Sequence, residues 1–101
     1  MIHVFPYRKG GYYRLYVTGH ADFNPGEDVV CAGVSALVCA LLSFARQAPD
    51  CKHLRHCEKK GEVFLACRGG LGKAYDAVLL GLRCIAQQYP SHVCVMRDTA
   101  M

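Results

Sequence analysis

The feature that most constrains the fold is a long apolar stretch between Val30 and Phe44. Apolar and small residues recur in it every three or four positions, the spacing of one side of an α-helix: Val30, Gly33, Leu37, Ala40, Leu41 and Phe44. The positions between hold Val34, Val38 and Leu42, so this helix should be buried on more than one side. We expect it to begin near Asp28, as a cap, and to end near Arg46, before Pro49.

Five β-strands and a second helix complete the predicted fold. Aromatic and β-branched residues predict strands at 2–7 and 12–18 with a turn at 8–11, and Leu15 and Val17 share one face of the second strand. Further strands are predicted at 51–58, 62–67 and 92–97, and a helix with clear apolar spacing at 73–89. The order ββαββαβ predicts an α+β fold, a single two-layer domain with a mixed β-sheet and two helices on one face.

Composition places the chain among globular proteins. Its 101 residues are 52% hydrophobic and 20% charged, which predicts one domain over residues 1–101. We see no apolar run long enough to span a membrane and no signal peptide at the N-terminus, so we expect a cytoplasmic protein. Its seven cysteines are then free thiols rather than a disulfide framework. The net charge of +4 permits work near RNA without requiring it.

Cys31 and His20 are the candidate nucleophile and base. A thiol near a helix N-terminus lies at the positive end of the helix dipole, which lowers its pKa and favours the reactive thiolate. An imidazole within reach completes a nucleophile–base pair. The alternatives are that Cys31 is a packing residue in an apolar helix and that His20 is a strand-end histidine facing water.

Three further residues are candidates for supporting this pair. Asp28 either caps the helix or orients the His20 imidazole, with Glu27 as the alternative orienting group. Ser35 lies one helical turn after Cys31, where its hydroxyl can bond the thiolate or the Cys31 carbonyl. Gly19 gives the backbone freedom next to His20, and backbone N–H groups near Cys31 are candidate oxyanion donors.

Two motifs in the chain resemble a known family. The first is Gly19-His20-Ala21, a short glycine-bearing loop and the run from Asp28 to Leu37, DVVCAGVSAL. The second is Gln88-Tyr89-Pro90 followed by Val93-Cys94-Val95. Together with the length and the order of elements, they resemble Prp, the ribosomal-processing cysteine protease family, over nearly the whole chain.

The resemblance implies a function, a substrate and an assembly. It implies a cysteine endopeptidase (a hydrolase, or thiol protease) that removes the short N-terminal extension of large-subunit ribosomal protein number twenty-seven, a step of ribosome biogenesis. It also implies a homodimer, with no membrane, no metal and no organic cofactor. The segment between base and nucleophile would close on the extended peptide, with Phe23 as one apolar contact; its residues are Ala21, Asp22, Phe23, Asn24, Pro25 and Gly26.

Two other classes of protein are the rivals. A non-enzymatic ribosome-associated or RNA-binding module would use basic residues that we place in turns: Arg8, Lys9, Lys52, Arg55, Lys59 and Lys60. A zinc or redox protein would use four potential ligands, Cys51, His53, His56 and Cys57. These ligands are crowded into one short segment and would struggle to surround one ion, so we expect no metal there.

Overall fold

The order of helices and strands is the predicted ββαββαβ. A computed structural model describes residues 1–20 and 28–97. The chain runs through β1 (Ile2–Lys9), β2 (Tyr12–Thr18), α1 (Val29–Gln47), β3 (Lys52–Lys59), β4 (Glu62–Arg68), α2 (Gly72–Gln88) and β5 (Val93–Val95). The predicted substrate segment, residues 21–26, and Glu27 lie outside the described residues.

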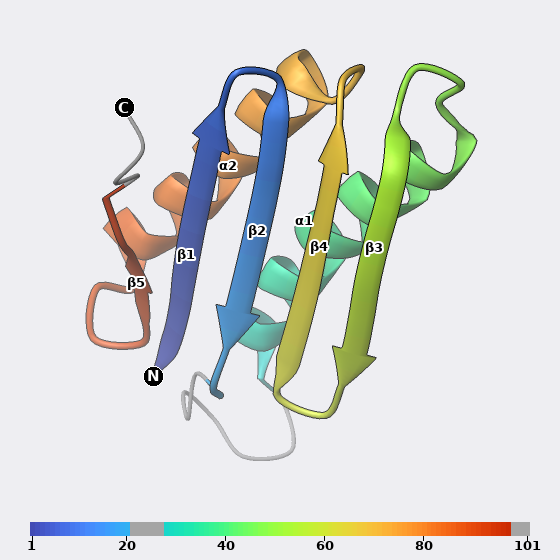
Figure 1. Cartoon of the computed structure of the whole chain (residues 1–101). Helices are drawn as coiled ribbons and strands as arrows, with labels where there is room; N and C mark the ends of the chain where they lie inside the picture. Colours follow the sequence, from blue (N-terminus) through green and yellow to red (C-terminus); the bar gives the residue numbers. More distant parts are fainter. Residues whose placement is uncertain (21–27, 98–101) are drawn as a thin grey trace.

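The five strands form one mixed sheet in the order β3-β4-β2-β1-β5. All neighbours are antiparallel except β1 and β5, which run parallel. Strand β2 is central, and it pairs along its whole length with both β1 and β4. Both helices cover the same face of the sheet (Figure 1), so the predicted α+β two-layer fold is confirmed.

The hydrophobic core fills the space between the sheet and the helices. Alternate strand residues point into it, as the side-chain period of two requires, and they include Val4, Leu15, Val17 and Leu65. The buried side of α1 supplies Val30, Val34, Val38, Leu41, Leu42 and Ala45, and α2 supplies Tyr75, Val78 and Leu82. Burying each large aliphatic side chain contributes about 1.5–3 kcal/mol, so these layers hold each other in place.

Glycines let the two helices approach closely. A Cβ atom at Gly33 of α1 would lie 3.3 Å from the Ile85 side chain, and one at Gly81 of α2 would lie 2.9 Å from Leu37. Gly33 therefore makes its close approach with α2. These contacts fix the position of α1 along the sheet.

Three boundaries differ from the prediction. Strand β1 continues through Arg8 and Lys9, because these residues pair with Tyr13 and Tyr12, and the turn is confined to Gly10 and Gly11. Strand β5 is three residues long. Lys52, Arg55 and Lys59 lie within edge strand β3 rather than in turns.

The basic residues grouped from the sequence do not form one surface. Arg8 points into the helix layer, where its guanidinium pairs with Asp76 of α2 and lies over the rings of Tyr13 and Tyr75. This exposed ion pair neutralises its charge on the helix side of the sheet, while the basic residues of β3 remain at the sheet edge.

Helix α1 is long and apolar enough, by length and composition, to cross a membrane. The prediction that the chain has no apolar run long enough to span a membrane is therefore wrong, judged by length and composition. In the fold, one side of this helix belongs to the core.

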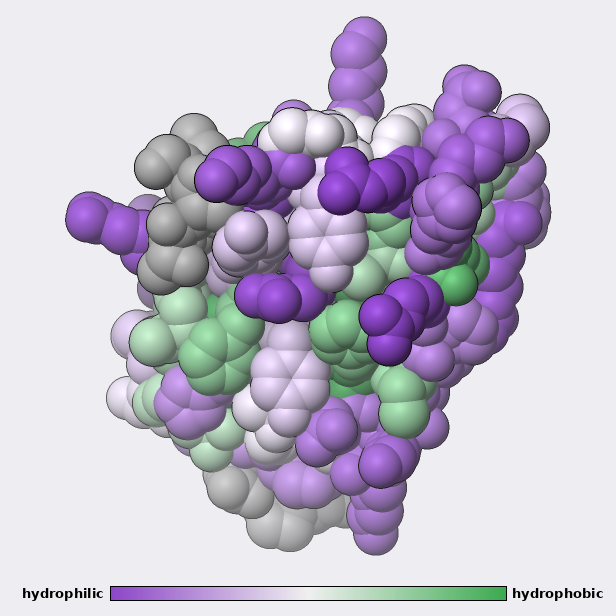
Figure 2. Space-filling model, in the orientation of Figure 1, coloured by the Kyte–Doolittle hydropathy of each residue, from purple (hydrophilic) through white to green (hydrophobic). Residues whose placement is uncertain are grey.

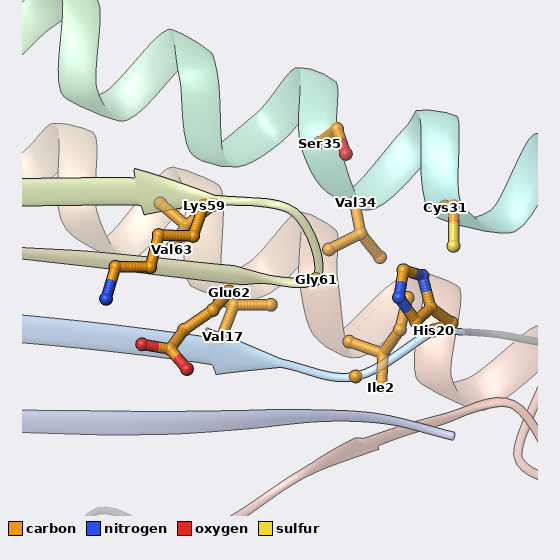
Figure 3. A pocket seen from close by; sticks show the side chains of 11 residues that line it. Ile2, Val17, His20, Cys31, Val34, Ser35, Lys59, Gly61, Glu62 and Val63 are labelled. Carbon is orange, nitrogen blue, oxygen red and sulfur yellow. The ribbon is translucent and has the colours of Figure 1, made fainter.

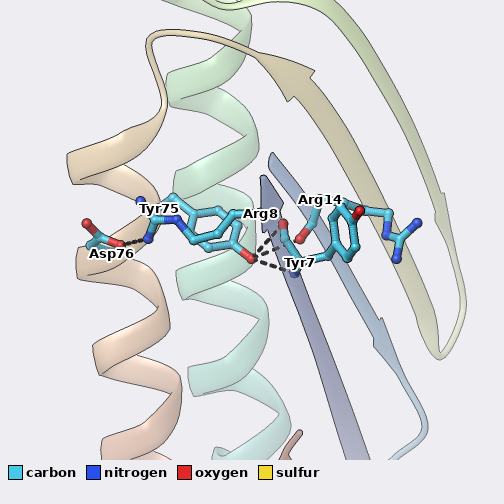
Figure 4. Close-up of polar contacts among 5 residues, drawn as sticks. All are labelled: Tyr7, Arg8, Arg14, Tyr75 and Asp76. Carbon is cyan, nitrogen blue, oxygen red and sulfur yellow. Dashed lines mark hydrogen bonds and ion pairs between the residues drawn. The ribbon is translucent and has the colours of Figure 1, made fainter. Parts of the chain in front are cut away.

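The hydroxyl of Tyr75 joins the helix layer to the centre of the sheet. The Tyr7 N–H donates to this hydroxyl (3.0 Å), which donates to the Arg14 carbonyl (2.9 Å), so one side chain of α2 bridges the paired residues of β1 and β2 (Figure 4). Tyr75 is buried. Both backbone groups would lose this partner if the hydroxyl were removed.

We expect Tyr75→Phe to lower the free energy of unfolding by about 1–3 kcal/mol, the usual cost of buried backbone groups left without a partner. Urea unfolding followed by circular dichroism measures it. Tyr16→Phe is the matched control, because its ring lies on the opposite face of the same sheet. Equal stability losses in the two variants would contradict a bridging role.

Candidate active site

A pocket lies where the end of β2, the start of α1 and the β3–β4 turn meet (Figure 3). Its volume is about 210 Å³. Its lining comes from segments far apart in the sequence: Ile2, Val17, Gly19, His20, Cys31, Val34, Ser35, Lys59, Gly61, Glu62 and Val63. The pocket therefore brings together four predicted site residues, Gly19, His20, Cys31 and Ser35.

Cys31 lies in the first turn of α1 and is half-buried at the pocket. The positive end of the helix dipole favours a thiolate at this position. Its sulfur is directed towards the His20 ring (Figure 3). The other helix cysteines, Cys39 and Cys84, are exposed away from this pocket.

His20 follows β2, and its ring rests against the β3–β4 turn. A Cβ atom at Gly61 would lie 2.8 Å from His20 Nε2, a distance that real Cβ atoms do not reach. Gly61 also has φ +76°, in the left-handed region that favours glycine. Gly61 therefore leaves the space in which the imidazole sits.

Gly19 fixes the backbone next to His20. Its N–H donates to the Gly61 carbonyl (2.9 Å), which extends the β2–β4 pairing one step past the strand. Its φ is +102°, and a Cβ atom there would lie 2.2 Å from the Met1 carbonyl oxygen. A residue with a side chain would displace the chain N-terminus, so the supporting role predicted for Gly19 has a physical cause.

Asp28 caps α1. Its Oδ1 accepts a hydrogen bond from the Cys31 N–H (2.8 Å), and its carbonyl accepts one from Ala32 (3.1 Å). These bonds confirm the capping alternative, while orientation of His20 by Asp28 stays a prediction. They also engage two of the backbone N–H groups that we expected near Cys31 as oxyanion donors.

The pocket has an apolar wall and a charged rim. Ile2, Val17 and Val34 are buried on the core side, and Ser35 is exposed one turn beyond Cys31. Lys59 at the end of β3 and Glu62 at the start of β4 border the pocket, and their charged groups extend away from His20 and Cys31 (Figure 3). The Lys-Lys-Gly sequence predicts the β3–β4 turn but carries no signal that His20 packs against it, so its link with the site was not predictable from the sequence.

The remaining cysteines and histidines offer no competing centre in the described part of the chain. No group of three or more His, Cys, Asp or Glu side chains there is arranged to hold a metal ion. His56 and Cys57 are adjacent on β3 and so point to opposite faces, and His56 bonds Glu58. Burial, together with the neighbouring Cys51 thiol, raises the pKa of Cys67 to about 11, so that thiol is protonated at neutral pH.

The chain is similar to proteins of one family. The family model described as cysteine protease Prp matches residues 1–94. The structure of the S. aureus ribosomal processing protease Prp with a covalently linked product peptide superposes with a TM-score of 0.75 at 21% identity, covering 94% of this chain and 97% of that one. The same S. aureus protease with a substrate peptide gives a TM-score of 0.71 at 20% identity, covering 95% and 98%.

A protein from Streptococcus mutans gives a TM-score of 0.73 at 26% identity, covering 97% of this chain and 94% of that one. No curated protein sequence matches significantly. Because the family model spans nearly the whole chain, this protein belongs to the Prp family and is a cysteine protease.

Proposed function

We propose that this chain is an endopeptidase that uses the Cys31–His20 pair to remove the short N-terminal extension of large-subunit ribosomal protein number twenty-seven. The observation that carries the proposal is the pocket in which a helix-start thiol and a strand-end imidazole meet. We place the reaction in the cytoplasm, as one step in maturing the ribosome. The S. aureus relative is a ribosomal processing protease whose structures hold bound peptides, which supports this substrate class.

The proposed reaction needs no group beyond the two side chains and water. His20 takes the Cys31 proton, and the sulfur attacks the scissile carbonyl carbon to form a C–S bond. The intermediate collapses, the C–N bond breaks, and His20 gives its proton to the leaving amine. Water, deprotonated by His20, then attacks the acyl carbon, which breaks the C–S bond and regenerates the thiol.

The pocket suits an apolar side chain next to the scissile bond. Its inner wall is aliphatic, from Ile2, Val17, Val34 and Val63, and its charges are limited to the rim. A charged side chain would lose its hydration in such a pocket without a matching partner. The extension of the proposed substrate, with apolar and aromatic residues before the cut, fits this wall.

The match to a cysteine protease family rules out the rival of a non-enzymatic module. We further propose that the chain works as a homodimer in which the outward side of α1 meets a second copy. No residue from Val29 to Ala45 is charged, yet this side is exposed, with Val29 62% and Phe44 45% accessible. Ala32, Ala36 and Ala40 lie between them, and an exposed apolar stripe of this kind is typical of an interface.

The nucleophile is tested with a peptide that copies the ribosomal extension. We expect the wild-type protein to cut it once and to leave a charged peptide of equal length intact. Cys31→Ser should fold but lose the activity, because a serine hydroxyl does not ionise at neutral pH as a thiol does. Cys84→Ser, at an exposed cysteine of α2, is the control that should retain full kcat/KM. Turnover by Cys31→Ser, or equal cutting of both peptides, would refute the proposal.

The role of Gly61 in positioning the His20 imidazole is tested with Gly61→Ala. A methyl group there would push the imidazole away from Cys31, and a displacement near 1 Å costs about 100-fold in rate, so we expect kcat/KM to fall by about that factor. Gly11→Ala is the matched control: its φ is +83° and nothing lies within 4 Å of an added Cβ. It imposes similar backbone strain without touching His20. Equal losses of kcat/KM in both variants would show that strain, rather than the position of His20, causes the effect.

The dimer is tested by sedimentation velocity. We expect the 11.1-kDa chain to sediment as a dimer and Ala36→Glu to sediment as a monomer, because two copies of the new carboxylate would be buried against each other. Ala77→Glu places the same charge on an exposed position of α2 and should leave the dimer intact. A dimer that resists Ala36→Glu would rule out this surface.

A further inference from the structure

The face of the sheet opposite the helices is open and carries an unusual set of side chains. Its aromatic residues come from three adjacent strands: Phe5, Tyr7, Tyr12, Tyr16 and Phe64. Figure 2 shows this face, with apolar and aromatic groups lying between strongly hydrophilic ones. A sheet face left uncovered would normally be polar throughout, since apolar strand residues gain by burial.

Four of these rings form two contacting pairs on this face. Phe5 and Tyr16 stack with ring centroids 5.9 Å apart, and Tyr7 meets Tyr12 edge-on at 6.0 Å. A shallow depression of about 430 Å³ is lined by Phe5, Arg14, Tyr16 and Phe64. Phe5 is 39% exposed, and Tyr16 and Phe64 are half-buried, so the rings that line the depression are partly accessible to another planar group.

Arginines lie among these rings. The Arg14 guanidinium is 4.5 Å from the centre of the Tyr7 ring, and that of Arg68 is 5.6 Å from the centre of the Tyr12 ring. Arg14 and Arg55 are both register partners of Ala66, one on each side of β4. Cations therefore lie on three adjacent strands of the face.

These three arginines are not neutralised by the described part of the protein. The ion pairs among the described residues are Arg8–Asp76, Arg46–Glu58 and His56–Glu58, and none involves this face. Among the described residues, one carboxylate, that of Glu62, lies on this face. Glu62 precedes Ala66 by four residues on β4 and is the register partner of Thr18. The positive charge is thus available to an anionic partner.

We propose that this open sheet face, here called the arginine–tyrosine face, binds single-stranded RNA. Unpaired bases stack on aromatic side chains and on guanidinium planes, while phosphates pair with arginine. A second copy of this chain fits less well, because two such faces placed together would set Arg14, Arg55 and Arg68 against their own like charges. An RNA duplex keeps its bases stacked inside and would leave the rings without partners.

The rings of the arginine–tyrosine face and the Cys31 side of the pocket lie on opposite sides of the sheet, and Glu62 at the start of β4 borders both. RNA stacked on the rings therefore leaves Cys31 accessible. The helices lie behind the sheet in Figure 1, and Cys31 belongs to helix α1. The register of β1, β2 and β4 places the aromatic residues on the other face of the sheet. If the substrate is a ribosomal protein, an inference that rests on the proposed function, bound RNA would hold the protease near it and raise its effective concentration.

The test measures binding by fluorescence anisotropy. A labelled twelve-nucleotide single-stranded RNA and a duplex of the same sequence are each titrated with the protein at salt concentrations from 50 to 300 mM. We expect the single strand to bind with an affinity that falls steeply as salt rises. The double variant Arg14→Gln/Arg68→Gln should bind more weakly, and its log–log salt slope should be shallower by about 0.7 for each lost phosphate contact. Tyr16→Ala should weaken binding about tenfold through lost stacking.

The control is Lys73→Gln/Arg83→Gln, which removes the same charge from exposed positions of α2 and should bind like wild type. Circular dichroism establishes that each variant is folded. No binding at 50 mM salt, tighter binding to the duplex, or equal losses in the control would overturn the proposal. A change of sedimentation mass in Arg14→Gln/Arg68→Gln would instead assign this face to a second copy. The assay needs no peptidase activity, so its outcome is independent of the proposed cleavage.

Discussion

The position of His20 depends on the hydrogen bonding of β2. This strand is paired along its length with β1 on one side and β4 on the other, and the Gly19–Gly61 bond carries the pairing beyond its last residue. A strand held on both sides cannot shift at its end without breaking these bonds. His20 is thereby attached to the central strand of the sheet, while Cys31 comes from the helix layer.

The distance between Cys31 and His20, the pair that we propose to be catalytic, is therefore set by the packing of α1 on the sheet. Val30 and Val34 are buried next to Cys31, and Gly33 brings α1 against Ile85 of α2. Asp28 fixes the start of the helix, a cap that contributes about 1 kcal/mol. The Cys31 N–H is already bonded to Asp28. An oxyanion formed in the proposed reaction therefore needs other hydrogen-bond donors, or Asp28 must release this N–H as the reaction proceeds.

The two layers also present different outer surfaces. The helix layer shows the uncharged side of α1, and the sheet shows rings and arginines on its open face. Two arginines illustrate the difference between these surfaces. Arg8 points towards the helices and pairs with Asp76, whereas Arg14 points outward and lies over Tyr7. Because side chains alternate between the two faces of a strand, these two basic residues of the paired strands β1 and β2 lie on opposite faces of the sheet.

Local chemistry determined much of this protein from the sequence alone. The order of elements, the helix start at Asp28, the opposite faces of β2 and the placement of Cys31 in the first turn depend on residues within a few positions of one another, so spacing and propensity reveal them. The tertiary structure decided what lies beside them. Arg8 and Lys9 are strand residues because Tyr13 and Tyr12 pair with them. Gly61 faces His20 because β2 pairs with β4 rather than with a neighbour in sequence, a contact between distant residues that no local pattern records.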